Sequence, residues 1–261
     1  FYTNSTTAGT SATEFEDDDG NTGHSPSAVG NTSANTTVKK FGASSAEFDG
    51  SGDYLSVPDH ADWDLGTAGS GDFTLDMFLN FQTFGDGTPF IGVYNGGVDA
   101  VPAWEVRTVT GADRIQLASL VSGGFDTESK VAWSPTLDTW YHLAIIRSSS
   151  TITLYIDGVS QGTFTDLDMT SGNNYQLELG GSSGSPSPAL WMDEVRVSNT
   201  ARWTSNFTPP TSEYTSDSNT LLLMHMNEKA ATSDTTHDIT LISNTTVAES
   251  QPDQANIVML V

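Results

Sequence analysis

The chain has no cysteine among its 261 residues, so no disulfide can form and cysteine usage says nothing of its compartment. It also lacks any run of about 18 consecutive apolar residues, which argues against a membrane-spanning helix. Basic residues are scarce, because 9 Lys and Arg stand against 33 Asp and Glu and give a formal net charge of −24. Such a charge repels nucleic-acid phosphates and anionic membrane surfaces. We therefore expect neither a nucleic-acid partner nor membrane insertion.

The chain is rich in short segments in which apolar and polar residues alternate, and Gly, Ser, Thr and Asp join these segments. In residues 73–81 the apolar side chains recur at every second position, and only Phe78 breaks the alternation. A period of two is typical of a strand with one buried face. The same reading predicts strands at 46–57, 72–81, 89–94, 103–109, 114–121, 140–147, 151–157, 159–165, 175–180 and 190–198.

One hairpin is especially clear. Asp157 and Gly158 suit a two-residue turn, and Ile152, Leu154 and Ile156 alternate with polar residues before it. Many short strands without helical periodicity indicate an all-β protein of two packed antiparallel sheets.

Four separated motifs carry a resemblance to a known family. They are FDGSGDYLSVPD at 48–59, GDFTLDMFLNF at 71–81, WYHLAIIRSSSTITLYIDG at 140–158 and WMDEVRVSNTARW at 191–203. In this order and spacing they resemble the concanavalin A-like lectin/glucanase superfamily, most closely its laminin-G-like jelly roll. The resemblance implies a two-sheet antiparallel jelly-roll sandwich. The superfamily includes sugar-binding modules, adhesion domains, glycosidases and structural units, so fold alone does not give the function.

The resemblance and the composition together predict three parts. Residues 1–40 form a polar N-terminal arm partly packed on the sandwich, 41–215 form the sandwich, and 216–261 form a C-terminal strand segment. LLLMHMNE at 221–228 resembles the segment that opens a unit of the family. It therefore either closes this sandwich or begins a further repeat or subunit contact. The apolar tail at 257–261 is expected to pair with a sheet or another chain.

Hydrolysis of a glycoside requires two carboxylates on one face, and the sequence offers no good pair. Glu47 and Asp49 alternate, but the Gly-Ser-Gly turn takes Asp53 off their strand. Asp193 and Glu194 are adjacent, which sends them to opposite faces of a strand and excludes a catalytic pair. Neither HExxH nor GxSxG occurs. We expect no catalytic residues and no enzyme activity.

Two binding sites are predicted instead. Sugar recognition combines an aromatic platform with amide and carboxylate groups. The segment after residue 93 has this composition, with Tyr94, Asn95, Asp99 and Trp104 as candidate glycan-binding residues, although a core position is the more common one for any single Trp. Calcium prefers oxygen ligands, and the resemblance implies Asp193 as a ligand. The candidate Ca²⁺ set is Asp49, Gly50, Asp53 and Asp193, with turn stabilisation as the alternative role for these Asp residues.

The sequence therefore favours a non-enzymatic, surface-exposed structural or adhesion protein. The resemblance implies a virion surface, as a capsid decoration or tail fibre, or another extracellular assembly. Its expected partners are cell-surface glycans or other structural proteins, with oligomers formed through sheet edges. The alternatives are a carbohydrate-binding module or glucanase-type glycosidase, and a filament subunit that exchanges strands.

Overall fold

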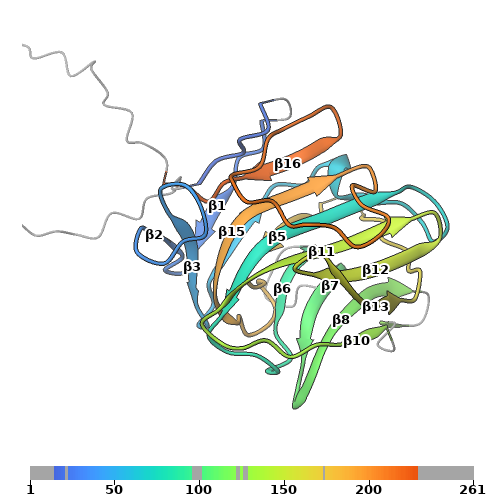
Figure 1. Cartoon of the computed structure of the whole chain (residues 1–261), viewed down its shortest axis with the longest axis horizontal. Coiled ribbons are helices and arrows are strands. Elements are labelled where there is room, and N and C mark those ends of the chain that lie inside the picture. The colour runs from blue at the N-terminus through green and yellow to red at the C-terminus, as the bar shows by residue number, and fades with distance from the viewer. Residues whose placement is uncertain are drawn as a thin grey trace, which may run out of the picture. The chain divides into compact units, whose positions relative to one another are not determined.

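The computed structural model describes residues 15–20, 23–95, 102–121, 124–125, 129–172 and 174–228. Within them, two antiparallel sheets of eight strands each pack into a sandwich (Figure 1). The one helical element in this part of the chain is a single 3₁₀ turn, η1 (Ala61–Trp63). None of the described segments forms a helix that is both long and apolar enough to span a membrane.

Sheet A has the strand order β1 (Ser27–Val29), β4 (Tyr54–Val57), β14 (Gln176–Leu179), β6 (Pro89–Tyr94), β7 (Pro102–Val109), β8 (Ala112–Val121) and β10 (Lys130–Ala132), with β9 (Gly124–Phe125) also paired to β8. Sheet B has the order β13 (Val159–Phe164), β12 (Thr151–Ile156), β11 (Trp140–Ser148), β5 (Phe73–Phe81), β15 (Ala189–Ser198), β3 (Ser45–Asp49) and β2 (Ser33–Asn35), with β16 (Thr220–Met224) also paired to β15. Figure 1 shows β16, β15, β5, β11, β12 and β13 side by side in one layer.

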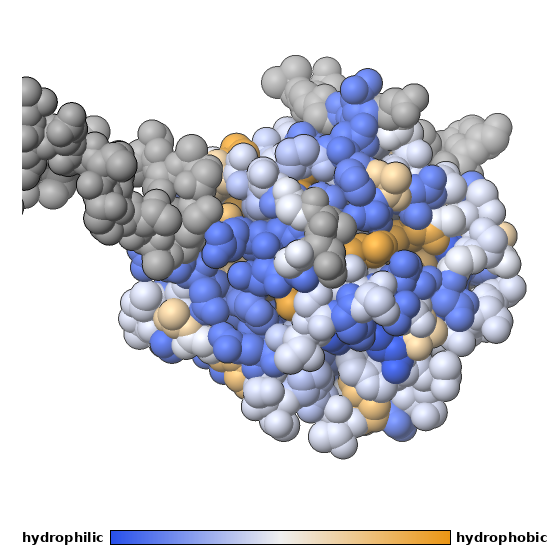
Figure 2. Space-filling model, turned by 90° about the horizontal axis from the view of Figure 1, so that it is seen from above, coloured by the Kyte–Doolittle hydropathy of each residue, from blue (hydrophilic) through white to orange (hydrophobic). Residues whose placement is uncertain are grey.

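The alternation in β5 is confirmed. Its odd-numbered residues, from Phe73 to Phe81, are buried in the core between the sheets. Phe78 points to the other side of sheet B and is also buried, because it packs there against Tyr214 and Leu223 in a separate cluster. Its departure from the pattern reflects a second layer of side chains over this sheet. The exposed face shown in Figure 2 is mostly hydrophilic, with small hydrophobic patches, as the negative charge leads one to expect.

Most predicted strands are present with shifts of a few residues at their ends. The predicted segment 46–57 is divided, because Gly50 and Gly52 adopt positive φ angles of 89° and 78° and turn the chain from β3 to β4. The hairpin between β12 and β13 is also confirmed. Asp157 and Gly158 both have positive φ, as a two-residue hairpin turn requires, and Ile156 pairs with Val159.

The segment that begins at residue 216 contributes β16 to the same sandwich. Along one side of β15, β3 pairs with its first half and β16 with its second half. The arm before β1 lies against β16, where the Asp18 amide donates to the Leu223 carbonyl at 2.6 Å. β16 is therefore a strand of sheet B. The tail at 257–261 lies outside the described residues.

A buried arginine ties a loop to the end of sheet B. Arg147 is fully buried at the end of β11 and stacks on Phe73 at 4.8 Å. Its guanidinium donates to a ring of backbone carbonyls, those of Leu65, Gly66, Thr67, Gly71 and Leu167. One side chain therefore satisfies four backbone carbonyls of the connection between η1 and β5 and ties this connection to Leu167.

Candidate functional site

The connection between β15 and β16, which we call the 199–219 segment, covers the outer face of sheet B. Trp203 and Phe207 from this segment stack on each other at 3.9 Å with nearly parallel rings. They pack on a patch of the sheet formed by Ala144, Ile146 and Tyr155. Aromatic burial therefore holds this irregular segment on the sheet.

A cavity of about 560 Å³ opens between β15 and this segment. That size falls in the range of roughly 300–1,000 Å³ typical of small-molecule sites. Two aromatic rings, two arginines, one carboxylate and several hydroxyls surround it. The lining residues are Arg196, Thr200, Ala201, Arg202, Trp203, Pro210, Ser212, Glu213, Tyr214 and Thr215.

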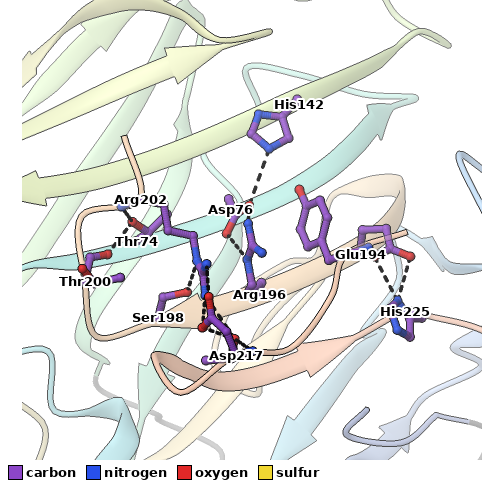
Figure 3. A network of polar contacts seen from close by, with 12 residues as sticks. Thr74, Asp76, His142, Glu194, Arg196, Ser198, Thr200, Arg202, Asp217 and His225 are labelled. Carbon is purple, nitrogen blue, oxygen red and sulfur yellow. Dashed lines mark hydrogen bonds and ion pairs between the residues drawn. The ribbon is translucent and has the colours of Figure 1, made fainter. Parts of the chain in front are cut away.

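A buried ion pair forms the base of this region (Figure 3). Arg196 of β15 donates to both carboxylate oxygens of Asp76 on β5, at 3.1 and 2.8 Å, and its guanidinium lies 4.2 Å from the ring of Tyr214. His142 Nε2 lies 3.6 Å from Asp76 Oδ2, longer than a normal hydrogen bond. Burial alone would raise the pKa of Asp76, but His142 and Arg196 outweigh it and the pKa is lowered. Asp76 is therefore held as an anion and is unsuited to donate a proton.

The second arginine anchors the 199–219 segment. Arg202 makes two 3.0 Å bonds to Asp217 and donates to Ser198 Oγ at 2.7 Å. These bonds hold the pKa of Asp217 well below its usual range. Thr74 on β5 donates to the Thr200 carbonyl and accepts from the Arg202 amide. Both arginines among the described residues that line the cavity are thus neutralised by a carboxylate, so this lining offers no free cation to an anionic ligand.

A β-bulge in β15 corrects one expectation. Asp193 and Glu194 lie on the same outer face of sheet B, because the register against β5 shifts between Asp193 and Arg196 and Glu194 has a φ of 52°. Glu194 accepts from the Tyr214 amide at 2.7 Å and contacts His225 Nδ1 at 2.9 Å. Hydrogen bonding to Glu194 raises the pKa of His225. Glu194 is therefore a buried structural acceptor.

The four predicted calcium ligands do not converge. Ala189 pairs with Asp49, and Asp193 lies four residues further along β15, roughly 13 Å away at about 3.3 Å per residue. Asp193 Oδ2 accepts from the Lys40 and Phe41 amides, while Oδ1 is buried without a described partner. Burial raises the pKa of Asp193 to about 7. The residues therefore do not fit one shared ion.

The remaining three candidates stabilise their own turn. Asp53 is buried and accepts from the amides of Asn31 and Asp49, at 2.8 and 2.9 Å. Asp49 accepts from the Ser51 amide and from the Asn31 side chain, both at 2.8 Å. Gly50 supplies the positive φ that the turn requires. These contacts match the turn-stabilising alternative.

The predicted glycan-binding residues are dispersed. Tyr94 and Trp104 are each only 1% exposed, and both belong to strands rather than to a loop, Tyr94 as the last residue of β6 and Trp104 in β7. Trp104 belongs to the core, where its ring N–H donates to the Trp63 carbonyl. Neither ring has a face for a sugar, which corrects the expectation of a platform at these two residues. Asn95 is exposed at the end of β6, and Asp99 lies outside the described residues.

The outer face of sheet A has a polar pair that the sequence did not reveal. Glu178 of β14 pairs with Gly92 of β6, which pairs in turn with Glu105 of β7, so two acids flank a glycine. Glu105 accepts from Tyr94 Oη and is 2.8 Å from Arg107. Burial raises the pKa of Glu178, which also accepts from the Ser183 amide. The alternation of Leu177 and Leu179 with Glu178 was the feature of the sequence that could have placed Glu178 on this outer face.

The cavity was missed for a different reason. Trp203 occurs in a motif that carried the resemblance, but Ser212, Glu213 and Tyr214 occupy an irregular segment without a recognisable pattern. Only the folding of that segment onto sheet B brings them near Arg196.

The fold and the sequence motifs together identify the family of this protein. A model of the concanavalin A-like lectin/glucanases superfamily matches residues 49–206, and the chain belongs to that family. No curated protein sequence matches the chain.

Solved structures share the fold at low sequence identity. Domain 4 of AbnA, an extracellular arabinanase of Geobacillus stearothermophilus solved with arabinotriose, is 20% identical with a TM-score of 0.51, over 72% of this chain and 92% of that one. The receptor-binding domain of botulinum neurotoxin D is 12% identical with a TM-score of 0.49, over 73% and 47%. A sialidase of Trypanosoma rangeli is 15% identical with a TM-score of 0.46, over 68% and 27%. At these identities the likeness concerns the fold alone.

Proposed function

We propose that the protein is a non-enzymatic module that binds neutral glycans in the cavity beside the 199–219 segment. The observation that carries this proposal is the lining itself, which combines half-buried Trp203 with Ser212, Glu213 and further hydroxyls. Sugars present apolar C–H faces beside hydroxyl groups, so an aromatic wall with polar groups around it matches their chemistry. The neutralised arginines and the net charge of −24 both disfavour acidic sugars.

The lining also supports the non-enzymatic part of the proposal. Glu213 is the only carboxylate among the described residues that surround the cavity. Glycoside hydrolysis needs two, and the nearby Asp76 is held in an ion pair with Arg196. A domain of the same fold has been solved with arabinotriose, so neutral arabinan and glucan fragments are suitable first probes.

The test is binding of the purified chain to immobilised glycans. We expect a neutral oligosaccharide to bind, and Trp203→Ala and Glu213→Gln each to weaken it about tenfold or more, equivalent to about 1.4 kcal/mol. Trp133→Ala is the matched control, because Trp133 is a half-buried aromatic that packs against Phe81 and Phe84, away from the cavity. Unchanged binding by both cavity variants would contradict the proposed site.

A glycosidase is the second candidate, and Glu105 and Glu178 are the observation that favours it. Their strands are separated by one strand, so their Cα atoms lie about 10 Å apart. A buried acid with a raised pKa beside an ion-paired carboxylate is an arrangement used in acid–base catalysis. Against it, both acids are almost fully buried. Release of reducing sugar from a neutral glycan that is lost in Glu178→Gln would establish this alternative.

The surface role follows from the resemblance and is proposed with the binding activity. An acidic glycan-binding sandwich suits a virion surface or another extracellular assembly, where it would contact host glycans or neighbouring structural proteins. Labelling of intact native particles with an antibody against the sandwich tests this role. Staining only after the particles are disrupted would contradict it.

A further inference from the structure

Two histidines and an aspartate meet where the N-terminal arm crosses the start of η1. His24 Nε2 lies 3.1 Å from Asp62 Oδ2, and His60 Nδ1 lies 2.9 Å from the same oxygen. The three ligand-type atoms all lie within 4.8 Å of one another. His24 and His60 are far apart in sequence, so only the folded chain brings these groups together.

The surroundings hold the first histidine in place. The His24 ring lies 4.7 Å from the buried Trp63 ring and 4.8 Å edge-on from His60, and its side chain is only 6% exposed. Its backbone amide donates to Asp17 Oδ2 at 3.1 Å. The His60 side chain is 48% exposed and can adjust. One ligand is thus fixed and another is accessible from solvent.

The Nδ1 atom of His60 has two neighbours on Asp62. Its Nδ1 accepts from the Asp62 amide at a long 3.3 Å, yet the same atom is closer to the Asp62 carboxylate oxygen. One Nδ1 atom cannot accept from the amide and donate to the carboxylate in the same tautomer, so only one of these two contacts is a hydrogen bond at a time. In the tautomer with its proton on Nε2, the Nδ1 lone pair is available to a metal ion.

We propose that His24, His60 and Asp62 bind a divalent transition-metal ion of the zinc type. Two imidazoles and a carboxylate are ligands that zinc accepts, and imidazole distinguishes it from calcium and magnesium. Ligands about 2.0–2.1 Å from a tetrahedral zinc ion lie about 3.3 Å apart, close to the two nitrogen–oxygen distances observed. Binding requires the two imidazole nitrogens, which lie within 4.8 Å of each other, to be about 3.3 Å apart, and it gives up the weak amide contact of His60. The ion joins the N-terminal arm to the connection between β4 and β5.

The experiment uses the full chain without a histidine tag, freed of metal by chelator and dialysed at pH 7.5. Titration with zinc chloride in a calorimeter should give one ion per chain and should raise the melting temperature, because the ion binds the folded state. His60→Gln and Asp62→Asn should each weaken zinc binding by more than the roughly 10- to 100-fold typical of losing an outer-shell partner. Both changes lie at partly exposed side chains, so the variants should fold as the parent does.

His225→Gln is the matched control, because His225 belongs to the other histidine and carboxylate cluster, with Glu194 and Glu213. It should leave zinc affinity unchanged, and calcium should give no comparable rise in melting temperature. Absence of zinc binding in the parent chain would overturn the proposal. So would binding that is lost in His225→Gln but retained in His60→Gln, or an equal response to calcium.

Discussion

At the scale of single residues, Asp76 and Arg196 form a pair whose charges are both almost completely buried. We predict that Asp76→Ala destabilises the fold by about 3–5 kcal/mol, because it leaves an unpaired guanidinium under the 199–219 segment. Urea unfolding followed by tryptophan fluorescence measures the loss.

Two comparisons give this prediction its controls. Replacing both partners with apolar residues, Asp76→Leu with Arg196→Met, should cost less than Asp76→Ala alone. Asp217→Asn removes a half-exposed partner of Arg202 and should cost about 1 kcal/mol or less. Equal losses for Asp76→Ala and Asp217→Asn would mean that the buried pair is not held as described.

Asp193 should give the stability a pH dependence. Its pKa is about 7 in the fold against 3.8 ordinarily, so between these pH values the folded chain holds a proton that the unfolded chain has released. Stability contributed by this group is therefore present below about pH 4 and is lost as pH rises towards 7. We predict that Asp193→Asn gains stability relative to the parent as pH rises through this window.

The measurement is the difference in unfolding free energy between parent and variant at pH 5 and at pH 8. Taking the difference between parent and variant removes the contributions of the other titrating groups, including His225. Asn can still accept from the Lys40 and Phe41 amides, so the fold should persist. A difference that is the same at both pH values would rule out the raised pKa.

At the scale of the strand and turn, Gly158 has a steric role beyond its positive φ of 75°. A Cβ atom there would lie 1.9 Å from the Phe207 carbonyl oxygen, in the 199–219 segment. We predict that Gly158→Ala costs more than Gly111→Ala. Gly111 also has a positive φ, of 64°, but no atom within 4 Å of its added Cβ. Gly111→Ala should therefore cost only the roughly 1–2 kcal/mol of the left-handed conformation, and thermal unfolding of both variants decides the comparison.

The regular alternation of apolar and polar residues made most strands predictable from the sequence. The irregular elements could not be predicted in this way. β5 and the β12–β13 hairpin follow directly from apolar residues at every second position and from Asp157 and Gly158. The bulge at Glu194 was invisible, because its geometry depends on the Tyr214 amide and His225, which come from later in the chain. The burial of Tyr94 and Trp104 could not be predicted either, because it depends on the length and pairing of β6 and β7. The cavity requires the path of the 199–219 segment, which no local pattern specifies.

At the scale of the whole molecule, β16 is an integral strand of the sandwich. We predict that deleting residues 219–261 unfolds the chain, because Leu222 and Met224 are fully buried and each such side chain contributes about 1.5–3 kcal/mol. The comparison is a chain that ends at residue 229 and keeps β16. Circular dichroism and gel filtration of the two chains provide the readout.

The same deletion distinguishes assembly by strand exchange. If β16 were donated between subunits, the shorter chain would stay folded and lose only its oligomers. Pairing of Val195 with Met224 and of Val197 with Leu222 within one chain favours unfolding instead.

The described chain enters and leaves the sandwich at one place, since the Asp18 amide bonds to the Leu223 carbonyl and the His225 amide bonds to the Asp18 carboxylate. Mechanical load applied through residues 15 and 228 would act first on the contacts nearest to them, which are the burial of Phe15 in the core and the bonds from the Glu228 amide to Ser44 Oγ and from the Ala43 amide to Asn227 Oδ1. These contacts lie outside the strand ladders, so the ends of the described chain would open locally while the paired strands stay intact.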